Sequence, residues 1–113
     1  MDSVIKQEWL AALRSGKYEQ TTGSLCIESM RYARRFCCLG VLCDILQDEV
    51  GMCWEYGCED DCPFLVFGNM ELTPPPLVRE LSGLSPAETA TIAKINDNSD
   101  SYEPAIDYIE EYL

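Results

Sequence analysis

The sequence predicts an α+β fold in which helices pack on a small antiparallel sheet made of two hairpins. Apolar residues at helical spacing mark both ends of the chain, and strand-prone residues fill two segments in between. A long apolar run between those two segments predicts a central buried helix. The chain has 113 residues, enough for one core and too few for two, so we expect a single domain over residues 1–113.

The first predicted helix spans residues 3–14. Its apolar residues share one face at helical spacing, namely Ile5, Trp9, Leu10 and Leu13. Asp2 or Ser3 can cap its start, and Ser15–Gly16 ends it.

The first hairpin and the central helix follow. Residues 20–35 are strand-prone and offer Glu28–Ser29 as a turn, which predicts the hairpin. Residues 36–47 are too long and too continuous for a strand and lack turn residues, so we expect a helix that is apolar over most of its circumference. This run holds three of the seven cysteines, Cys37, Cys38 and Cys43, and Asp44 follows the last of them.

The second half of the chain predicts a second hairpin and three helices. Two short apolar runs, 53–56 and 64–67, form the hairpin around an acidic turn at residues 59–61. Three prolines at 74–76 lead into a short helix that runs through Leu81.

The last two helices have clear start signals. Ser85–Glu88 is a capping box with proline at the first helical position, and its helix should run to about Ile95 and break at residues 96–98. Ser101 caps the final helix. The apolar stripe of that helix consists of Tyr102, Ala105, Ile106, Ile109, Tyr112 and Leu113.

The formal net charge of −12 is unevenly distributed. Residues 36–113 hold sixteen acidic and only two basic residues, whereas residues 1–35 carry a small positive excess. Such a surface repels nucleic acid and membrane phosphates, and it suits either solubility or a partner with a basic surface. For partner binding we expect the acidic turn and the last helix to matter most, through Glu59, Asp60, Asp61, Glu103, Asp107, Glu110 and Glu111.

The cysteines have two alternative interpretations. The chain shows no secretion signal and no apolar window long enough to span a membrane, so we expect a cytoplasmic protein with reduced thiols. The sequence has no histidine and no pair of cysteines with two residues between them, and both absences disfavour a zinc site. We expect no cofactor. If zinc binds, Cys53, Cys58 and Cys62 should hold it. Otherwise the cysteines pack as small hydrophobic residues.

Catalysis has little support in the sequence. The absence of histidine excludes Cys-His and Ser-His-Asp arrangements, and no glycine-rich loop could cradle a phosphate. Cys37 and Cys38 follow Arg34 and Arg35, the one setting that could lower a thiol pKa, although packing explains them equally well. We therefore expect a protein that acts by binding.

Three segments of the chain are similar to one known group of proteins. They are Trp9-Leu10-x-Ala12-Leu13-x-Ser15-Gly16-x-Tyr18-x-Gln20, then Phe36-Cys37-Cys38-Leu39-Gly40-Val41-Leu42-Cys43-Asp44, and Ile95-Asn96-Asp97 followed by Tyr102 and residues 106–113. Together they resemble small proteins encoded by bacteriophages and prophages, in which leucine usually stands at the position of Ile95. The resemblance implies a source but no mechanism, and residues 48–72 lie outside it.

The resemblance marks polar positions beside apolar ones, and Asp44 raises two hypotheses. A buried carboxylate needs partners, so Asp44 could be tied to Arg34, to Arg35 or to the Tyr18–Gln20 turn to hold the fold. Alternatively, a pocket for a small, nucleotide-like polar ligand is formed by Tyr18, Gln20, Arg35, Asp44, Asn96 and Asp97.

These observations favour a small phage-type accessory protein that binds a host or anti-phage defence protein with a basic surface and inhibits it, in the manner of a nucleic-acid mimic. The alternatives are a protein that sequesters a small ligand and a thiol or zinc protein. No direct contact with nucleic acid or membrane is expected, because the acidic surface repels both.

Overall fold

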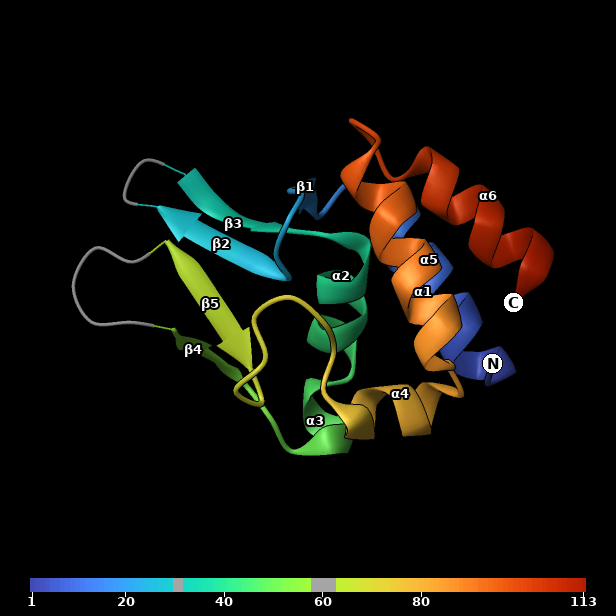
Figure 1. Ribbon diagram of the computed structural model, residues 1–113, viewed down its shortest axis with the longest axis horizontal. Coiled ribbons are helices and arrows are strands. Elements are labelled where there is room, and N and C mark those ends of the chain that lie inside the picture. Colours follow the sequence, from blue (N-terminus) through green and yellow to red (C-terminus); the bar gives the residue numbers. More distant parts are fainter. Residues whose placement is uncertain (30–31, 58–62) are drawn as a thin grey trace.

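The computed structural model describes all residues of the chain except 30–31 and 58–62. In this described part the helices are α1 (Ser3–Arg14), α2 (Cys38–Ile45), α3 (Gln47–Val50), α4 (Pro76–Ser82), α5 (Pro86–Asp97) and α6 (Glu103–Tyr112). The strands are β1 (Glu19–Gln20), β2 (Cys26–Ser29), β3 (Tyr32–Phe36), β4 (Trp54–Tyr56) and β5 (Phe64–Phe67). The predicted α+β class is confirmed (Figure 1).

The sheet differs from the predicted pair of antiparallel hairpins. Its strand order is β1-β3-β2-β5-β4, so one sheet contains both hairpins, joined through the antiparallel pairing of β2 with β5. The additional strand β1 runs parallel to β3, with Glu19 opposite Arg35, which makes the sheet mixed. Residues 19–20 were missed as a strand because a two-residue strand has no periodicity of its own and forms through pairing with a distant segment.

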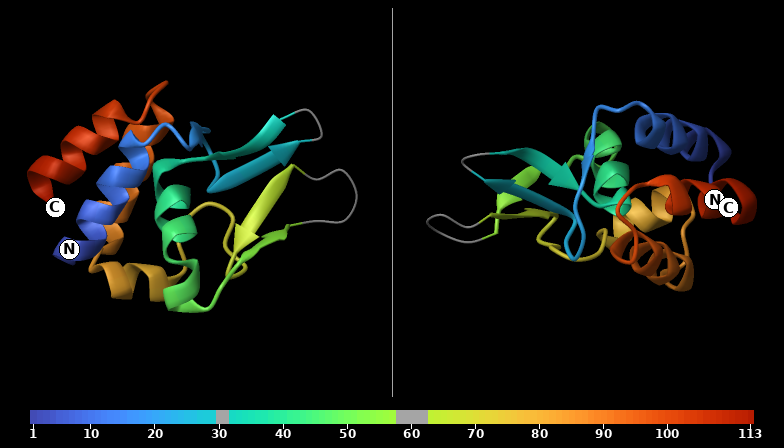
Figure 2. Two further views of the ribbon diagram at one scale, coloured as in Figure 1. Left: turned by 180° about the vertical axis from the view of Figure 1, so that it is seen from behind. Right: turned by 90° about the horizontal axis from the view of Figure 1, so that it is seen from above.

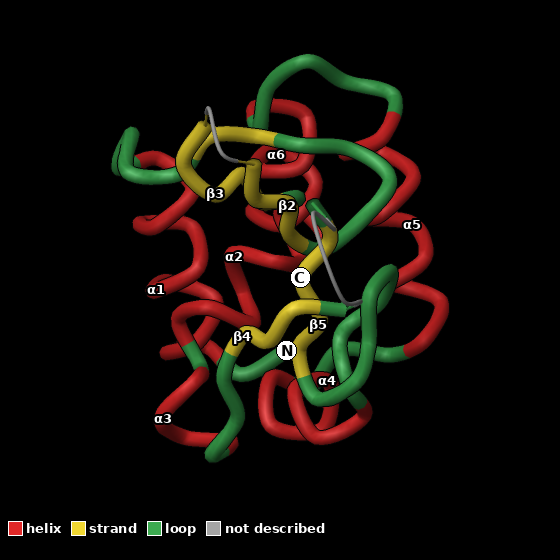
Figure 3. The backbone as a smooth tube through the Cα atoms, turned by 90° about the vertical axis from the view of Figure 1, so that its left-hand side faces the viewer, coloured by secondary structure: helices red, strands yellow, loops and turns green. Residues whose placement is uncertain are grey.

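The helix α2 is the centre of the fold (Figure 2). It contacts α1, α5 and β3, and all of residues 38–43 are buried. The longer strands extend from α2 on one side, and α1, α5 and α6 gather on the other. Figure 3 views the molecule from the sheet end. Trp9 links α1 to α2, because its buried indole N–H donates to the carbonyl of Cys38 at 2.8 Å. The predicted central apolar helix is therefore present.

Several predicted boundaries need correction. The helix expected from residue 36 begins at Cys38, because Phe36 ends β3 and the Cys37 sulfur caps the helix by accepting the Gly40 N–H at 3.3 Å. The turn expected at Glu28–Ser29 belongs to β2, since strand pairing continues through these residues. The acidic turn at 59–61 lies outside the described residues.

Two predicted N-terminal capping signals are confirmed, whereas the predicted cap of α6 by Ser101 is wrong, because Tyr102 is the N-cap of that helix and forms no side-chain capping bond. Asp2 caps α1 by accepting the Ile5 N–H at 2.9 Å, and Ser85 and Glu88 form the predicted capping box of α5 at 3.0 Å in both directions. The helix α5, however, continues through Asp97 and does not break at residue 96. No helix in the described residues is long and apolar enough to cross a membrane.

Candidate functional site

Asp44 lies at the end of α2 and accepts hydrogen bonds from three neutral groups. The Tyr18 hydroxyl donates to one carboxylate oxygen at 2.6 Å. The Trp54 indole N–H and the Gln47 amide donate to the other, each at 3.0 Å. Hydrogen bonding of this kind satisfies a half-buried carboxylate without a cation. Of the three partners considered for Asp44 in the structural hypothesis, the Tyr18–Gln20 turn is the one that the structure supports.

The two arginines considered as partners of Asp44 form ion pairs elsewhere. Arg34 lies 3.6 Å from Glu28, and Arg35 lies 3.4 Å from Glu19 on the neighbouring strand. Both pairs are partly exposed, so solvent screens them and each contributes little to stability.

Aromatic rings surround the Asp44 cluster. Tyr18 packs edge-on against Phe36 with ring centroids 5.1 Å apart, and Phe36 packs against Trp54 at 5.7 Å. Trp54 in turn contacts Phe67 at 5.0 Å. Two of the donors to Asp44, Tyr18 and Trp54, are thus held by aromatic packing, which indicates a structural joint between the sheet and the end of α2.

Replacement of Tyr18 by phenylalanine should destabilise the protein by about 2 kcal/mol, because a hydrogen bond to a charged group contributes about 1.5–3 kcal/mol. The ring and its contact with Phe36 would remain. Urea unfolding measures the change, with Tyr112→Phe as the control, since Tyr112 is 66% exposed and its substitution should change the free energy of unfolding very little. Equal stability of the two variants would show that the Tyr18 hydroxyl does not contribute through Asp44.

Asn96 forms the second polar cluster and is completely buried. Its side-chain oxygen accepts the Cys38 N–H at 3.1 Å and the Gln20 amide at 3.2 Å. Its side-chain nitrogen donates to the Thr21 carbonyl at 3.0 Å and lies 3.4 Å from the Asp97 carboxylate. Asn96 therefore joins the last turn of α5 to the start of α2 and to the segment after β1.

The side chains next to Asn96 complete this joint. Asp97 accepts the Gly23 N–H at 2.9 Å, and the Gln20 amide also donates to the Ser99 carbonyl at 3.2 Å. Because these groups bond one another, the polar motif after Ile95 fixes the chain between α5 and α6.

An open, shallow groove lies beside this cluster. It has a volume of about 1090 Å³. Its lining residues are Glu19, Gln20, Thr21, Thr22, Arg35, Asp97, Asn98, Ser99, Asp100 and Pro104.

The six residues of the predicted ligand pocket fall into different places. Gln20, Arg35 and Asp97 line the groove, and Asn96 lies buried beside it. Tyr18 and Asp44 belong to the separate cluster described above. Sequence reasoning missed Gln47 and Trp54 as partners of Asp44, although a Gln three residues after an Asp near a helix end is a recognisable local pair.

The buried cysteines are packing residues. Cys26, Cys37, Cys38 and Cys43 are buried and not in disulfides. Burial raises the pKa of the Cys37 thiol to about 11 and that of Cys26 to about 12, and it also raises the pKa of Cys38. A thiol that stays protonated at neutral pH is a poor nucleophile, so Cys37 and Cys38 lack the setting for catalysis that Arg34 and Arg35 could have provided.

These raised thiol pKa values predict a loss of stability at alkaline pH. The folded state keeps its thiols protonated, whereas the unfolded chain begins to ionise near the ordinary cysteine pKa of about 8.5. Between that pH and the folded pKa of Cys37, about 11, the unfolded state binds fewer protons, so stability falls as pH rises. Each such thiol should remove about 1.4 kcal/mol per pH unit.

Urea unfolding at pH 7, 9 and 10 measures this loss. Cys37→Ser is the matched variant, because serine keeps a capping acceptor for the Gly40 N–H but has no thiol to ionise. Its free energy of unfolding should fall with pH less steeply than that of the parent, by about 1.4 kcal/mol per pH unit. Identical slopes would contradict the assignment.

The predicted zinc ligands are only partly described. Cys53 is exposed and free, whereas Cys58 and Cys62 lie outside the described residues. Within the described part of the chain, no three Cys, Asp or Glu side chains come together in a way that could hold a metal ion.

The acidic residues predicted for partner binding separate into two groups. Glu59, Asp60 and Asp61 lie outside the described residues. Glu103, Asp107, Glu110 and Glu111 are exposed on α6.

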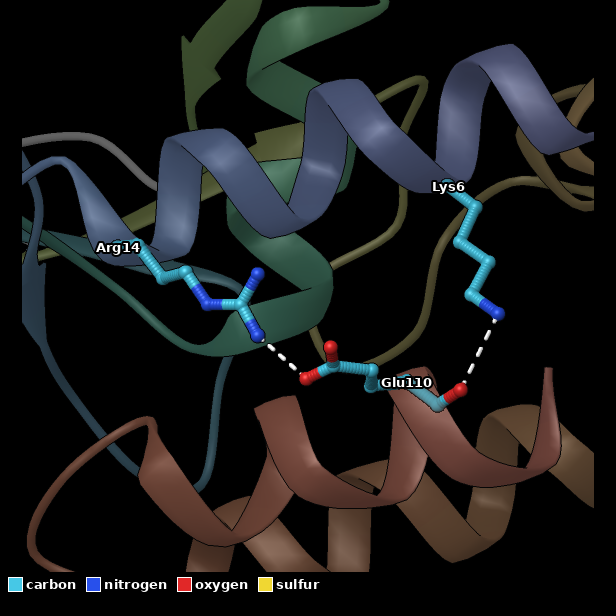
Figure 4. Close-up of polar contacts among 3 residues, drawn as sticks. All are labelled: Lys6, Arg14 and Glu110. Atoms are coloured by element: carbon cyan, nitrogen blue, oxygen red, sulfur yellow. Dashed lines mark hydrogen bonds and ion pairs between the residues drawn. The ribbon is translucent and has the colours of Figure 1, made fainter.

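Glu110 differs from the other acids of α6, because α1 binds it (Figure 4). Its carboxylate pairs with Arg14 at 2.5 Å, and its backbone carbonyl accepts the Lys6 ammonium at 3.3 Å. Both interactions are exposed, but together they tie the end of α6 to α1. Glu110 is therefore engaged within the chain.

A comparison with family models identifies the family of this chain. Residues 1–107 match the family described as Domain of unknown function (DUF8296). The chain belongs to this family. No curated protein and no solved structure gives a significant match.

The DUF8296 match includes the Asp44 and Asn96 clusters, the groove, and the first half of α6 through Asp107. The second half of α6, with Glu110 and Glu111, follows the matched region.

Proposed function

We propose that the protein is a small phage-type accessory protein that acts in the host-cell cytoplasm by binding. Its target would be a host or anti-phage defence protein with a basic surface, which it inhibits by presenting carboxylates where that target expects nucleic-acid phosphates. The resemblance of three sequence segments to phage and prophage proteins supports the source, and the net charge of −12 supports the chemistry of the partner.

The observation that carries this proposal is the row of carboxylates on α6. Glu103, Asp107 and Glu111 are exposed and follow one another four residues apart, so they lie on one face. At 1.5 Å of rise per residue they form a line of negative charge about 12 Å long. Such a line is suited to a row of basic side chains on a partner.

Helix stability explains Glu103, which lies in the first turn at the positive end of the helix dipole, but it does not explain Asp107 and Glu111. Like charges four residues apart repel, and a carboxylate in the last turn, such as Glu111, faces the negative end of the helix dipole. The repulsion lowers the stability of the helix by a few tenths of a kcal/mol for each pair. The unfavourable dipole interaction lowers it by about 0.3–1 kcal/mol. The row therefore favours a role outside the helix, and partner binding provides one.

Affinity capture from bacterial host extract tests the proposal. One variant carries Glu103→Gln, Asp107→Asn and Glu111→Gln, and a control variant removes three exposed charges elsewhere through Asp48→Asn, Glu49→Gln and Glu80→Gln. A partner that the parent and the control retain at low salt, and that the α6 variant and high salt both release, is the expected result. Retention of the same partner by both variants would contradict the proposal, as would the absence of any salt-sensitive partner.

A second candidate function is sequestration of a small polar ligand. The groove favours it, because the side chains of Gln20, Arg35 and Asp97 reach its lining. Native mass spectrometry of protein taken from infected cells would reveal such a ligand as added mass, and an unmodified mass from those cells would count against this function.

A further inference from the structure

The surface of α6 combines carboxylates with two tyrosines, of which Tyr112 is exposed and Tyr108 is partly buried. Tyr108 and Tyr112 pack against each other one helical turn apart, with ring centroids 5.1 Å apart and planes inclined by 37°. Tyr112 is 66% exposed, so its ring is accessible to a partner. The pair borders the acidic row, because Tyr108 and Glu111 are three residues apart and are therefore neighbours on the helix surface.

This combination matches the chemistry of a guanidinium group. The planar guanidinium stacks on aromatic faces and forms paired hydrogen bonds with carboxylates, whereas a lysine ammonium is a compact, strongly hydrated charge that gains less from either contact. The same helix already binds one guanidinium within the chain, because Arg14 pairs with Glu110. Carboxylates on α6 are thus accessible to an arginine approaching from another element.

We propose that the α6 surface formed by Asp107, Tyr108, Glu111 and Tyr112 binds an arginine-rich segment of the partner. This inference rests on the proposed function and specifies the partner further: arginine side chains, stacked on the tyrosine pair and paired with the flanking carboxylates, provide the recognition. The net charge of −12 attracts any cation, whereas the tyrosine pair adds a stacking surface that favours arginine over lysine.

Two synthetic peptides of equal charge, nona-arginine and nona-lysine, test the preference. The full-length protein is titrated with each peptide by calorimetry at about 0.1 M salt, where surface charges are partly screened. We expect nona-arginine to bind about threefold to tenfold more tightly than nona-lysine, as exposed cation–π contacts allow. Tyr112→Ala should reduce this preference to about twofold or less, and Tyr112→Phe should keep it, since the ring face is retained.

The matched control is Tyr56→Ala, because Tyr56 is 65% exposed on β4, in the sheet and outside α6. It should leave the arginine preference unchanged. Equal binding of the two peptides by the parent, or an equal effect of Tyr56→Ala and Tyr112→Ala, would overturn the inference.

The triple α6 variant separates this inference from the proposed function. If that variant loses both peptides while the parent shows no arginine preference, the acidic surface stands as the binding surface and the role of the tyrosines is rejected. If the variant binds both peptides as tightly as the parent does, α6 is not the binding surface and both proposals fail.

Discussion

The variant Gly40→Ala should have a much lower free energy of unfolding than the parent protein. A β-carbon at this position of α2 would lie 2.0 Å from the Leu25 carbonyl oxygen and 2.9 Å from the Leu25 carbonyl carbon. The same carbonyl accepts the Cys37 N–H at 3.1 Å, so the backbone cannot retreat without losing a buried hydrogen bond. We expect a destabilisation of more than about 3 kcal/mol, the upper range for overpacking in a core.

Thermal unfolding followed by circular dichroism measures this effect. A loss of about 3 kcal/mol corresponds to a lowering of the melting temperature by more than about 12 °C for a domain of this size. The control is Gly16→Ala, since nothing lies within 4 Å of a β-carbon there and only the positive φ of 78° opposes the substitution. That backbone strain costs about 1–2 kcal/mol. A cost at Gly40 no larger than at Gly16 would mean that α2 is not held against Leu25 as described.

The segment around Gly40 was predicted in part from its sequence. The continuous apolar character of residues 38–43 indicated a buried element, and the structure confirms it. The start was misplaced because Phe36 suits a strand and a helix equally well, and cysteine at position 37 is not a usual capping residue. The need for glycine at position 40 depends on Leu25, fifteen residues earlier, which no local pattern reveals.

The polar residues show the same division between local and distant information. Ser85 and Glu88 satisfy each other within one turn, so their spacing alone predicted the capping box. Asn96 is hydrogen-bonded to Cys38 and to Thr21, which lie 58 and 75 positions before it in the sequence. Its local sequence context predicted only a break between helices. Asp44 was identified as a carboxylate in need of partners, but the donation by Trp54 depends on how β4 joins the sheet.

Asn96→Ala should be the most destabilising substitution of a polar side chain in the described part of the molecule. It would leave the buried Cys38 N–H and the Thr21 carbonyl without their hydrogen-bond partner. Each unsatisfied buried group costs about 1–3 kcal/mol, so we expect a loss of about 3–5 kcal/mol in the free energy of unfolding. Asn98→Ala is the matched control, because Asn98 is exposed and donates only to the Lys94 carbonyl of its own helix, at 2.9 Å.

The variant Asn96→Asp tests the same network by charge. An ionised aspartate could still accept from Cys38 but could not donate to the Thr21 carbonyl, and its charge would be buried. Burial favours the protonated carboxyl in the folded state, so its folded pKa should lie above the unfolded value of about 3.9. The stability deficit of Asn96→Asp relative to the parent should therefore be smallest near pH 4 and grow as pH rises toward 7.

Urea unfolding of parent and variant at each pH measures that difference, since the effect of the other carboxylates on stability cancels in the comparison. A deficit that does not change with pH would contradict the buried donor role of Asn96. A folded, fully stable Asn96→Asp protein would instead favour the ligand pocket, because the buried hydrogen bonds of Asn96 would then not be needed for folding. Asn96 accepts from Cys38 and Gln20 and donates to Thr21, and these hydrogen bonds argue for the structural role. The exposed surface of α6 is therefore the place where binding is best sought.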